Sequence, residues 1–562
     1  MTIHVVQAGE TIGSIAAYYG VNPTQVATDN TVPASGALAV GQTLVIRFPR
    51  QVHAVQQGET LSSIAAYYGT TVRQLWRNNW SLRGGESLSP GQPLVISYFE
   101  EKLGTAVTNG YAYPYIEPEL LAEQLPYLTY LAPFTYGINA SGGLLPLNDD
   151  TLLSAARLRG TAPVMHLSTL TESGQFDTQR AELVLTDMEV QDRLVSEVIQ
   201  TTLRRGYAGV DVDFEFLPGQ LAAAYAAFLD RLRRRLQPQG RFLWAALAPK
   251  TSAGQPGLLY EGHDYAAVAA ATDAVLLMTY EWGYTYGPPM AVAPLPNVRA
   301  VLDYAVTTIP SEKIFLGIPN YGYDWPLPFV QGTTRAQSIS NQRAIELAVQ
   351  YQIAIQYDET AQSPYFHYTD HAGVVHEVWF EDARSMDAKL RLIAEYGFKG
   401  AGFWNLMRPF SQTWLVLGSL KASLFYAEKS FHIRNLSMSD YLRCKLLHKA
   451  ILSSPSSASC FSRGSKAVIS ENQDLSPSFS RSGFSQEACM CQSPKQPSRN
   501  HACQSPCSQR DSQQNRQIIE RSGVAQRPYC RCHLAAVVCG GSPDGNTVDG
   551  KSSSPGQKHH HC

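Results

Sequence analysis

The sequence predicts an α/β protein whose largest part is a (β/α)8 barrel, and two observations support this prediction. Between about Thr105 and Leu420, short apolar segments alternate with amphipathic helical segments, which is typical of a parallel sheet covered by helices. Eight such apolar segments are expected to be strands: 106–111, 128–134, 162–167, 209–216, 242–248, 274–280, 314–318 and 400–404. Eight strand–helix units over residues 105–420 fit a closed barrel with one insertion.

Helical periodicity identifies several of the connections between these strands. The expected helices are 178–204, 220–236, 296–308 and 382–396. An α+β insertion is expected at about 326–381, because residues 364–368 and 376–380 flank the turn 370–373 and form a hairpin.

Two copies of one sequence unit precede the barrel. Gly9-Glu10-Thr11 returns 49 residues later as Gly58-Glu59-Thr60, and Ser-Ile-Ala-Ala-Tyr-Tyr-Gly follows soon after each copy. Each unit has a short strand, a threonine that can cap a helix, a second short helix and a closing strand. The units, 1–49 and 50–98, resemble LysM domains, which bind N-acetylglucosamine in peptidoglycan or chitin. The resemblance implies glycan binding by these two triplets, and a purely structural role is the alternative.

Composition narrows the classes of partner. The formal net charge of −2 offers no argument for nucleic acid, and no apolar run approaches the roughly 20 residues that span a bilayer. Met1 leads directly into a polar, alternating stretch without the features of a secretory signal, so we expect synthesis in the cytoplasm.

The cysteines are confined to one end of the chain. All 10 lie between Cys444 and Cys562, so the barrel is expected to need no disulfide, and catalysis by cysteine is excluded there. Residues 421–562 are rich in Ser, Gln and Cys and predict disorder, or a reading frame that departs from the ancestral one. The cysteine pairs are not spaced like common zinc sites, and neither a metal nor a cofactor is expected.

The segment 209–216 (Gly-Val-Asp-Val-Asp-Phe-Glu-Phe) predicts the catalytic strand. Because side chains alternate along a strand, Asp211, Asp213 and Glu215 share one face, at intervals of about 6.6 Å. The apolar face suits burial under helices, so the acids must point into the barrel, with Glu215 nearest the C-terminal mouth. Crowded carboxylates acquire different pKa values and hence different roles. The alternative, acids that simply face water, needs a sheet open to solvent.

These acids match the last three positions of the DxxDxDxE motif of family 18 glycoside hydrolases, and Ala208 replaces its first Asp. Three further motifs follow in order. Met278-Thr279-Tyr280-Glu281 resembles M-x-Y-D, with Glu281 in place of Asp, the stretch 317–322 resembles the strand-seven motif, and Phe403-Trp404 falls where the family has its strand-eight tryptophan. The resemblance covers about residues 105–420.

The resemblance implies a substrate-assisted mechanism in which the 2-acetamido oxygen of the substrate attacks the anomeric carbon. Glu215 would protonate the leaving oxygen and then activate water, Asp213 would orient the acetamido group, and Asp211 would tune Asp213. Tyr280 would donate a hydrogen bond to the acetamido oxygen, and Trp404 would pack beneath the ring. The implied substrate-binding residues are Trp404, Glu281, Tyr111, Phe134 and Tyr321. His166, near the end of the third strand, is expected to be a packed histidine.

LysM units, a family 18 barrel and no signal peptide together resemble spore-germination or cortex-lytic glucosaminidases. This resemblance implies a peptidoglycan or chitin-type glycan as the partner, and a place in the spore cortex or coat, or otherwise on the cell wall. N-acetylglucosamine is the suitable residue in spore cortex, where many muramic residues form a lactam that ties up the nitrogen. A chitinase and a non-catalytic wall-binding coat protein are the alternatives.

Overall fold

The computed structural model describes residues 1–33 and 35–423, and a parallel barrel dominates them. Its strands follow the order β7-β6-β5-β18-β12-β11-β10-β9-β8. Only Val164 separates β7 from β8, so the sheet nearly closes on itself. The strands are β5 (Thr105–Ala112), β6 (Tyr130–Pro133), β7 (Ala162–Pro163), β8 (Met165–Ser168), β9 (Gly209–Asp213), β10 (Phe242–Leu247), β11 (Ala274–Leu277), β12 (Ile314–Pro319) and β18 (Gly400–Trp404).

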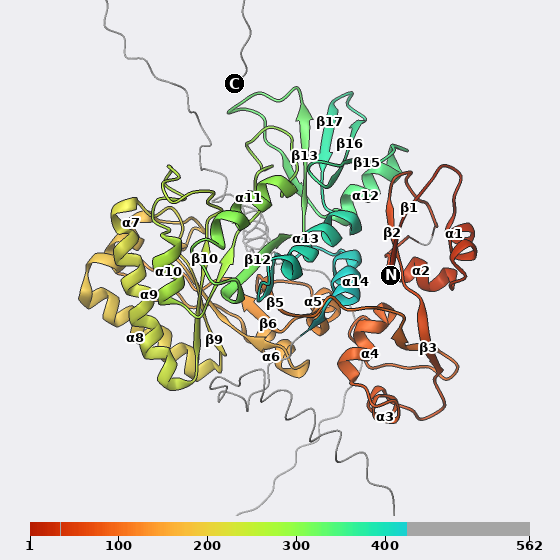
Figure 1. Cartoon of the computed structure of the whole chain (residues 1–562), viewed down its shortest axis with the longest axis horizontal. Helices are drawn as coiled ribbons and strands as arrows, with labels where there is room; N and C mark the ends of the chain where they lie inside the picture. Colours follow the sequence, from red (N-terminus) through yellow and green to blue (C-terminus); the bar gives the residue numbers. More distant parts are fainter. Residues whose placement is uncertain (34, 424–562) are drawn as a thin grey trace, which may run out of the picture. The chain divides into compact units, whose positions relative to one another are not determined.

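Helices cover the outside of this barrel, as Figure 1 shows for α8, α9 and α10 beside β9 and β10. The apolar residues of β9 that face outward are fully buried beneath them, as the expected fold requires. The helices are α5 (Pro118–Gln124), α6 (Asp150–Leu158), α7 (Thr178–Thr186), α8 (Met188–Arg205), α9 (Ala222–Leu236), α10 (Tyr265–Ala271), α11 (Leu295–Ala305), α13 (Ala383–Glu395) and α14 (Ser411–Leu420).

The predicted barrel is confirmed, and the differences lie where elements end or divide. All eight predicted segments contain a strand, although 162–167 is divided into β7 and β8. The predicted strand 209–216 ends at Asp213 instead of Phe216. The predicted helix 178–204 breaks at Asp187, because this side chain accepts hydrogen bonds from the backbone N–H groups of Glu189 and Val190 and so begins a new helix.

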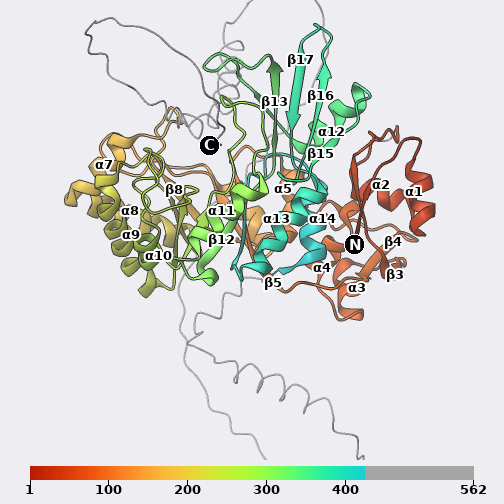
Figure 2. The ribbon, with the colours of Figure 1, turned by 45° about the horizontal axis from the view of Figure 1, so that its top comes forward.

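A second, antiparallel sheet follows β12, in the order β14-β13-β17-β16-β15. Figure 2 shows β13, β16 and β17 side by side. The predicted hairpin is present as β16 and β17, but the sheet begins at Gly322, before the expected start at 326. Its elements are β13 (Gly322–Leu327), β14 (Gln337–Ile339), α12 (Asn341–Gln350), β15 (Gln356–Asp358), β16 (Ser363–Thr369) and β17 (Val375–Trp379).

The two repeats have the same internal plan. Each pairs its first and last strands antiparallel around two helices, and Thr11 and Thr60 both close a capping box at the start of the first helix. The first repeat contains β1 (Thr2–Val5), α1 (Ile12–Tyr19), α2 (Pro23–Asp29) and β2 (Thr43–Ile46). The second contains β3 (Pro49–Ala54), α3 (Leu61–Tyr67), α4 (Val72–Asn78) and β4 (Pro93–Tyr98).

Buried polar groups link both repeats to the barrel domain. Gln412 of α14 donates to the carbonyl of Thr43 at 2.6 Å and accepts from the Thr43 hydroxyl at 2.8 Å. The buried Arg73 guanidinium donates to the carbonyls of Leu125, Pro126 and Gly160 at 2.8–2.9 Å. A buried cation without acceptors would be strongly destabilising, so these carbonyls account for an arginine at this position.

Within residues 1–33 and 35–423, no helix is long and apolar enough to cross a membrane. The part of the predicted tail from 424 to 562 lies outside the described residues.

Strands β18 and β5 approach each other so closely at Gly400 that we expect no larger side chain to fit there without a loss of stability. A Cβ added to Gly400 would meet the Val107 carbonyl oxygen at 1.7 Å, so Gly400→Ala must push the first and last strands apart. We expect a loss of roughly 1–3 kcal/mol in the free energy of unfolding, measured by urea titration. Gly254→Ala is the control, because a Cβ there meets nothing within 4 Å. Equal urea midpoints for the two variants would contradict this packing.

Candidate active site

Three acids line the inside of the barrel wall at β9. Asp211 and Glu215 are fully buried, and Asp213 is 2% exposed. The Tyr111 hydroxyl, on β5, donates to Asp211 Oδ2 at 2.7 Å. Because β5 and β9 are not neighbours in the sheet, this hydrogen bond crosses the barrel interior. Phe214 packs outward in the opposite direction, against Tyr225 and Phe228 of α9.

Glu215 lies beyond the end of β9, so the backbone after the strand determines its direction. Phe216 has a left-handed φ of 57°. Two side chains hold this turn: His263 Nε2 donates to the Phe214 carbonyl at 2.8 Å, and the Thr178 hydroxyl donates to the Phe216 carbonyl at 3.0 Å. His263 Nδ1 accepts from the backbone N–H of Ala248 at 2.9 Å, so the ring proton must be on Nε2.

Burial controls protonation throughout this interior. Desolvation raises the pKa of the Asp211 carboxyl to about 6, although the hydrogen bond from Tyr111 opposes this shift. The pKa values of the Tyr111 and Tyr280 hydroxyls are raised well above their usual range by burial first and then by the neighbouring acids. Both phenols therefore remain neutral hydrogen-bond donors at physiological pH. Burial also lowers the pKa of His263 to about 4, which keeps that ring uncharged.

A glutamate and two tyrosines form a second cluster, after β11 and beside β13. Glu281 has a left-handed φ of 70°, and the Tyr321 hydroxyl donates to its carboxylate. The Tyr323 hydroxyl donates to the same carboxylate at 3.0 and 3.1 Å. Sequence reasoning missed Tyr323, although its position two residues after Tyr321 was the available signal.

Aromatic rings surround Trp404, which ends β18. The Phe134 ring centroid lies 4.8 Å away, that of Tyr111 5.8 Å away and that of Tyr113 6.3 Å away. The structure thus brings the predicted residues Trp404, Phe134 and Tyr111 together, and it adds Tyr113. Apolar ring faces of this kind suit the C–H face of a sugar.

His166 was predicted to be a packed histidine, and it is 2% exposed. It also lies among the catalytic candidates, because its Nε2 is 3.7 Å from Asp213 Oδ2. Its place on β8, beside the catalytic strand, was the available signal.

In the repeats, the predicted glycan-binding triplets shape the loop before the first helix. Glu10 accepts from Gln7 N–H at 2.6 Å and pairs with His4 Nε2 at 2.8 Å, and the second repeat repeats this pattern with Glu59. Gly9 and Gly58 adopt φ values of 82° and 83° in the same turn. Glycan contact by these residues stays a prediction. The exposed aromatic side chains of the two repeats are Tyr18 and Tyr67, each 81% accessible.

Trp76 and Trp80 distinguish the second repeat from the first in sequence, and both are largely buried. They are 9% and 7% exposed, and the Trp76 indole donates to the Gly85 carbonyl at 2.7 Å. Both tryptophans therefore contribute to the packed interior of the protein.

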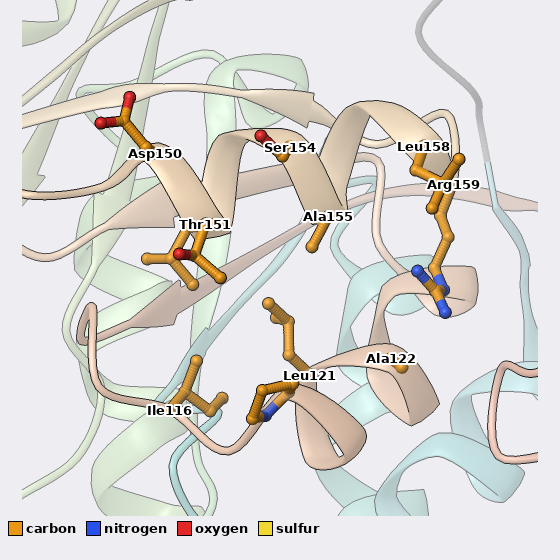
Figure 3. A pocket seen from close by; sticks show the side chains of 11 residues that line it. Ile116, Leu121, Ala122, Asp150, Thr151, Ser154, Ala155, Leu158 and Arg159 are labelled. Carbon is orange, nitrogen blue, oxygen red and sulfur yellow. The ribbon is translucent and has the colours of Figure 1, made fainter. Parts of the chain in front are cut away.

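A separate hollow of about 550 Å³ lies between α5 and α6. Figure 3 shows Thr151 and Ala155 of α6 pointing toward Leu121 of α5. Its lining is mostly apolar and includes none of Asp211, Asp213 and Glu215, so this hollow is distinct from the site at β9.

Comparisons with known proteins agree with this architecture. Residues 171–408 match the glycosyl hydrolases family 18, and residues 4–47 and 53–97 each match the LysM domain. The "Cortical fragment-lytic enzyme" of Bacillus subtilis (strain 168) is 40% identical over 426 residues, which cover 74% of this chain and 97% of that protein.

Solved structures give the same result. The spore cortex-lytic enzyme SleL of Bacillus megaterium QM B1551 is 36% identical, with a TM-score of 0.64 over 76% of this chain and 99% of that chain. A chitinase from Chromobacterium violaceum is 25% identical, with a TM-score of 0.52 over 56% of this chain and 98% of that chain. The chain therefore belongs to glycosyl hydrolase family 18, as an enzyme that carries two LysM domains before its barrel.

Proposed function

We propose that this protein hydrolyses spore cortex peptidoglycan at N-acetylglucosamine residues, by substrate-assisted catalysis with retention of configuration. The observation that carries the proposal is the set of three buried acids on and after β9, with Trp404 and Tyr280 in the same interior. The similarity to cortical fragment-lytic enzymes over nearly their whole length supports cortex as the substrate.

In the first step, Glu215 gives its proton to the glycosidic oxygen while the acetamido carbonyl oxygen bonds to the anomeric carbon. The bond to the leaving sugar breaks, and a cyclic oxazolinium ion forms. Asp213 orients the acetamido N–H and stabilises the positive charge, and the neutral Tyr280 hydroxyl donates to the acetamido oxygen. Water then adds to the anomeric carbon, Glu215 takes its proton, and the amide is restored.

The remaining residues act on these groups or on the sugar. Asp211, held by Tyr111, lies two residues before Asp213 and adjusts its protonation. Trp404, with Phe134 beside it, supports the reacting ring, and Glu281 with Tyr321 binds its polar groups. The two LysM units bind the same polymer through the loops that contain Gly9–Thr11 and Gly58–Thr60, which raises the local concentration of glycan at the barrel. We place the protein at the spore cortex or coat.

Removing the acidic proton should abolish hydrolysis but not binding. Glu215→Gln keeps the size of the side chain, and we expect release of reducing ends from purified cortex fragments to fall at least about 100-fold. Co-sedimentation with the same glycan should be unchanged. Glu182→Gln, on the exposed face of α7, is the matched control and should retain full activity. Full activity of Glu215→Gln would refute the assignment of the acid.

The chitinase alternative is supported by the similarity to the Chromobacterium violaceum enzyme, and substrates distinguish the two functions. We expect faster release from cortex fragments than from chitin oligomers, with N-acetylglucosamine at each new reducing end by mass spectrometry. Fragments from which acetyl groups have been removed should not be cleaved, because the attacking oxygen is missing. A strong preference for chitin would support the alternative, and no cleavage of either glycan would indicate a wall-binding protein without activity.

Burial of Asp211 predicts a pH dependence of stability. Its carboxyl has a pKa of about 6 in the folded protein against an ordinary 3.8, so the folded state holds a proton that the unfolded chain releases. The stabilisation is fully present below about pH 4 and is lost as the pH rises through 6, a change of roughly 3 kcal/mol. Asp211→Asn lacks this titration.

The measurement is the difference in unfolding free energy between wild type and Asp211→Asn, by urea titration from pH 4 to 7. Titrations common to both proteins cancel in this difference. As the pH rises, the asparagine variant should become more stable relative to the wild type. A difference that is constant across the range would contradict the raised pKa.

A further inference from the structure

The histidine on β8 occupies a position that the mechanism above does not use. His166 pairs with Asp211 in the register of β8 and β9, and its ring lies inside the barrel. Tyr111 meets the ring at 5.5 Å and 86°, and Phe134 packs on it at 4.8 Å. The one polar edge that faces the acids is Nε2, 3.7 Å from Asp213 Oδ2. This distance exceeds a hydrogen bond but is short for a charge and a dipole in a buried site.

The opposite nitrogen is held by a hydroxyl. Thr135 Oγ1 lies 2.7 Å from His166 Nδ1, the shortest of its contacts. Burial lowers the pKa of His166 to about 3, so the ring is neutral and carries a single N–H. When the Thr135 hydroxyl donates to Nδ1, that N–H is on Nε2 and points at Asp213. In the other tautomer a lone pair would face the carboxylate, which is repulsive while Asp213 is ionised.

The titratable groups that interact electrostatically with Asp213 include acids and phenols. Asp211 and Glu215 come from its own segment, Tyr111 from β5, Tyr225 from α9 and Tyr280 from the loop after β11. The two carboxyl groups disfavour a negative charge on Asp213, and burial disfavours it as well. His166 differs from these acids and phenols, because its neutral ring offers Asp213 an N–H and does not itself titrate near neutral pH.

We propose that His166 is a positioning residue for the reaction: the Thr135 hydroxyl holds its Nδ1, and its Nε2–H favours the ionised form of Asp213. The inference rests on the proposed role of Asp213, because the ionised carboxylate is what stabilises the positive acetamido group. In this role His166 stabilises the negative charge of Asp213 before the substrate binds, and the acetamido N–H of the substrate then provides a further donor.

Two substitutions separate this role from packing. His166→Asn retains a polar atom near Thr135 but removes the group that faces Asp213, whereas His166→Gln can extend an amide N–H toward it. We expect His166→Asn to shift the midpoint of the acidic limb of the kcat/KM profile to higher pH by about one unit, because the N–H dipole that favours the ionised carboxylate is lost. His166→Gln should stay nearer the wild-type profile. Thr135→Val keeps the side-chain shape but removes the hydroxyl, and it should shift the acidic limb to higher pH, as His166→Asn does.

Cortex-fragment hydrolysis from pH 4 to 8 and urea midpoints supply the readouts. A packing role alone would lower rate or stability without moving the acidic limb, and an unmoved limb in His166→Asn and Thr135→Val would overturn the proposal. Asp213→Asn distinguishes this failure from that of the proposed function. If Asp213→Asn retains full activity, the role of Asp213 is wrong. If it is inactive while His166→Asn keeps the wild-type limb, only the role of His166 is wrong.

Discussion

The crowding of three carboxyl groups on one dehydrated barrel wall is the constraint on which the rest of this structure depends. Asp211, Asp213 and Glu215 are at most 2% exposed, and neighbouring carboxylates in such a place cannot all be ionised without a large cost in free energy. Neutral donors such as Tyr111 and Tyr280 suit this environment, because they stabilise charge without adding charge. We infer that the site separates acids that hold a proton from acids that do not, which is the division of roles that glycoside hydrolysis needs.

The surrounding fold maintains this arrangement from several directions. Helix α9 buries Phe214 on the outer face, His263 holds the Phe214 carbonyl, and the close approach of β18 and β5 at Gly400 completes the wall that presents Trp404. Buried hydrogen bonds, including those of Arg73, attach the LysM repeats to the barrel domain. A polymer held by the repeats would thus be held at a defined place relative to the barrel.

Sequence patterns could predict the barrel, the repeats and the common face of the three acids, because these follow from local periodicity. They could not predict that β9 ends at Asp213, because the turn that carries Glu215 depends on His263, far away along the chain. The division of 178–204 into two helices was readable in principle from the capping residue Asp187. The contacts of Glu10 with His4 and of His166 with Thr135 join side chains whose pairing no pattern revealed.

The most direct measurement of the central claim is inhibition by a thiazoline derived from N-acetylglucosamine. Its fused five-membered ring imitates the cyclic species formed when the substrate's own amide attacks carbon 1. Substrate assistance predicts competitive binding about 100-fold tighter, or more, than that of N-acetylglucosamine itself, and weaker binding when Asp213 is replaced by asparagine. Equal affinity for the thiazoline and the simple sugar would show that an enzyme carboxylate or water, and not the acetamido group, performs the attack.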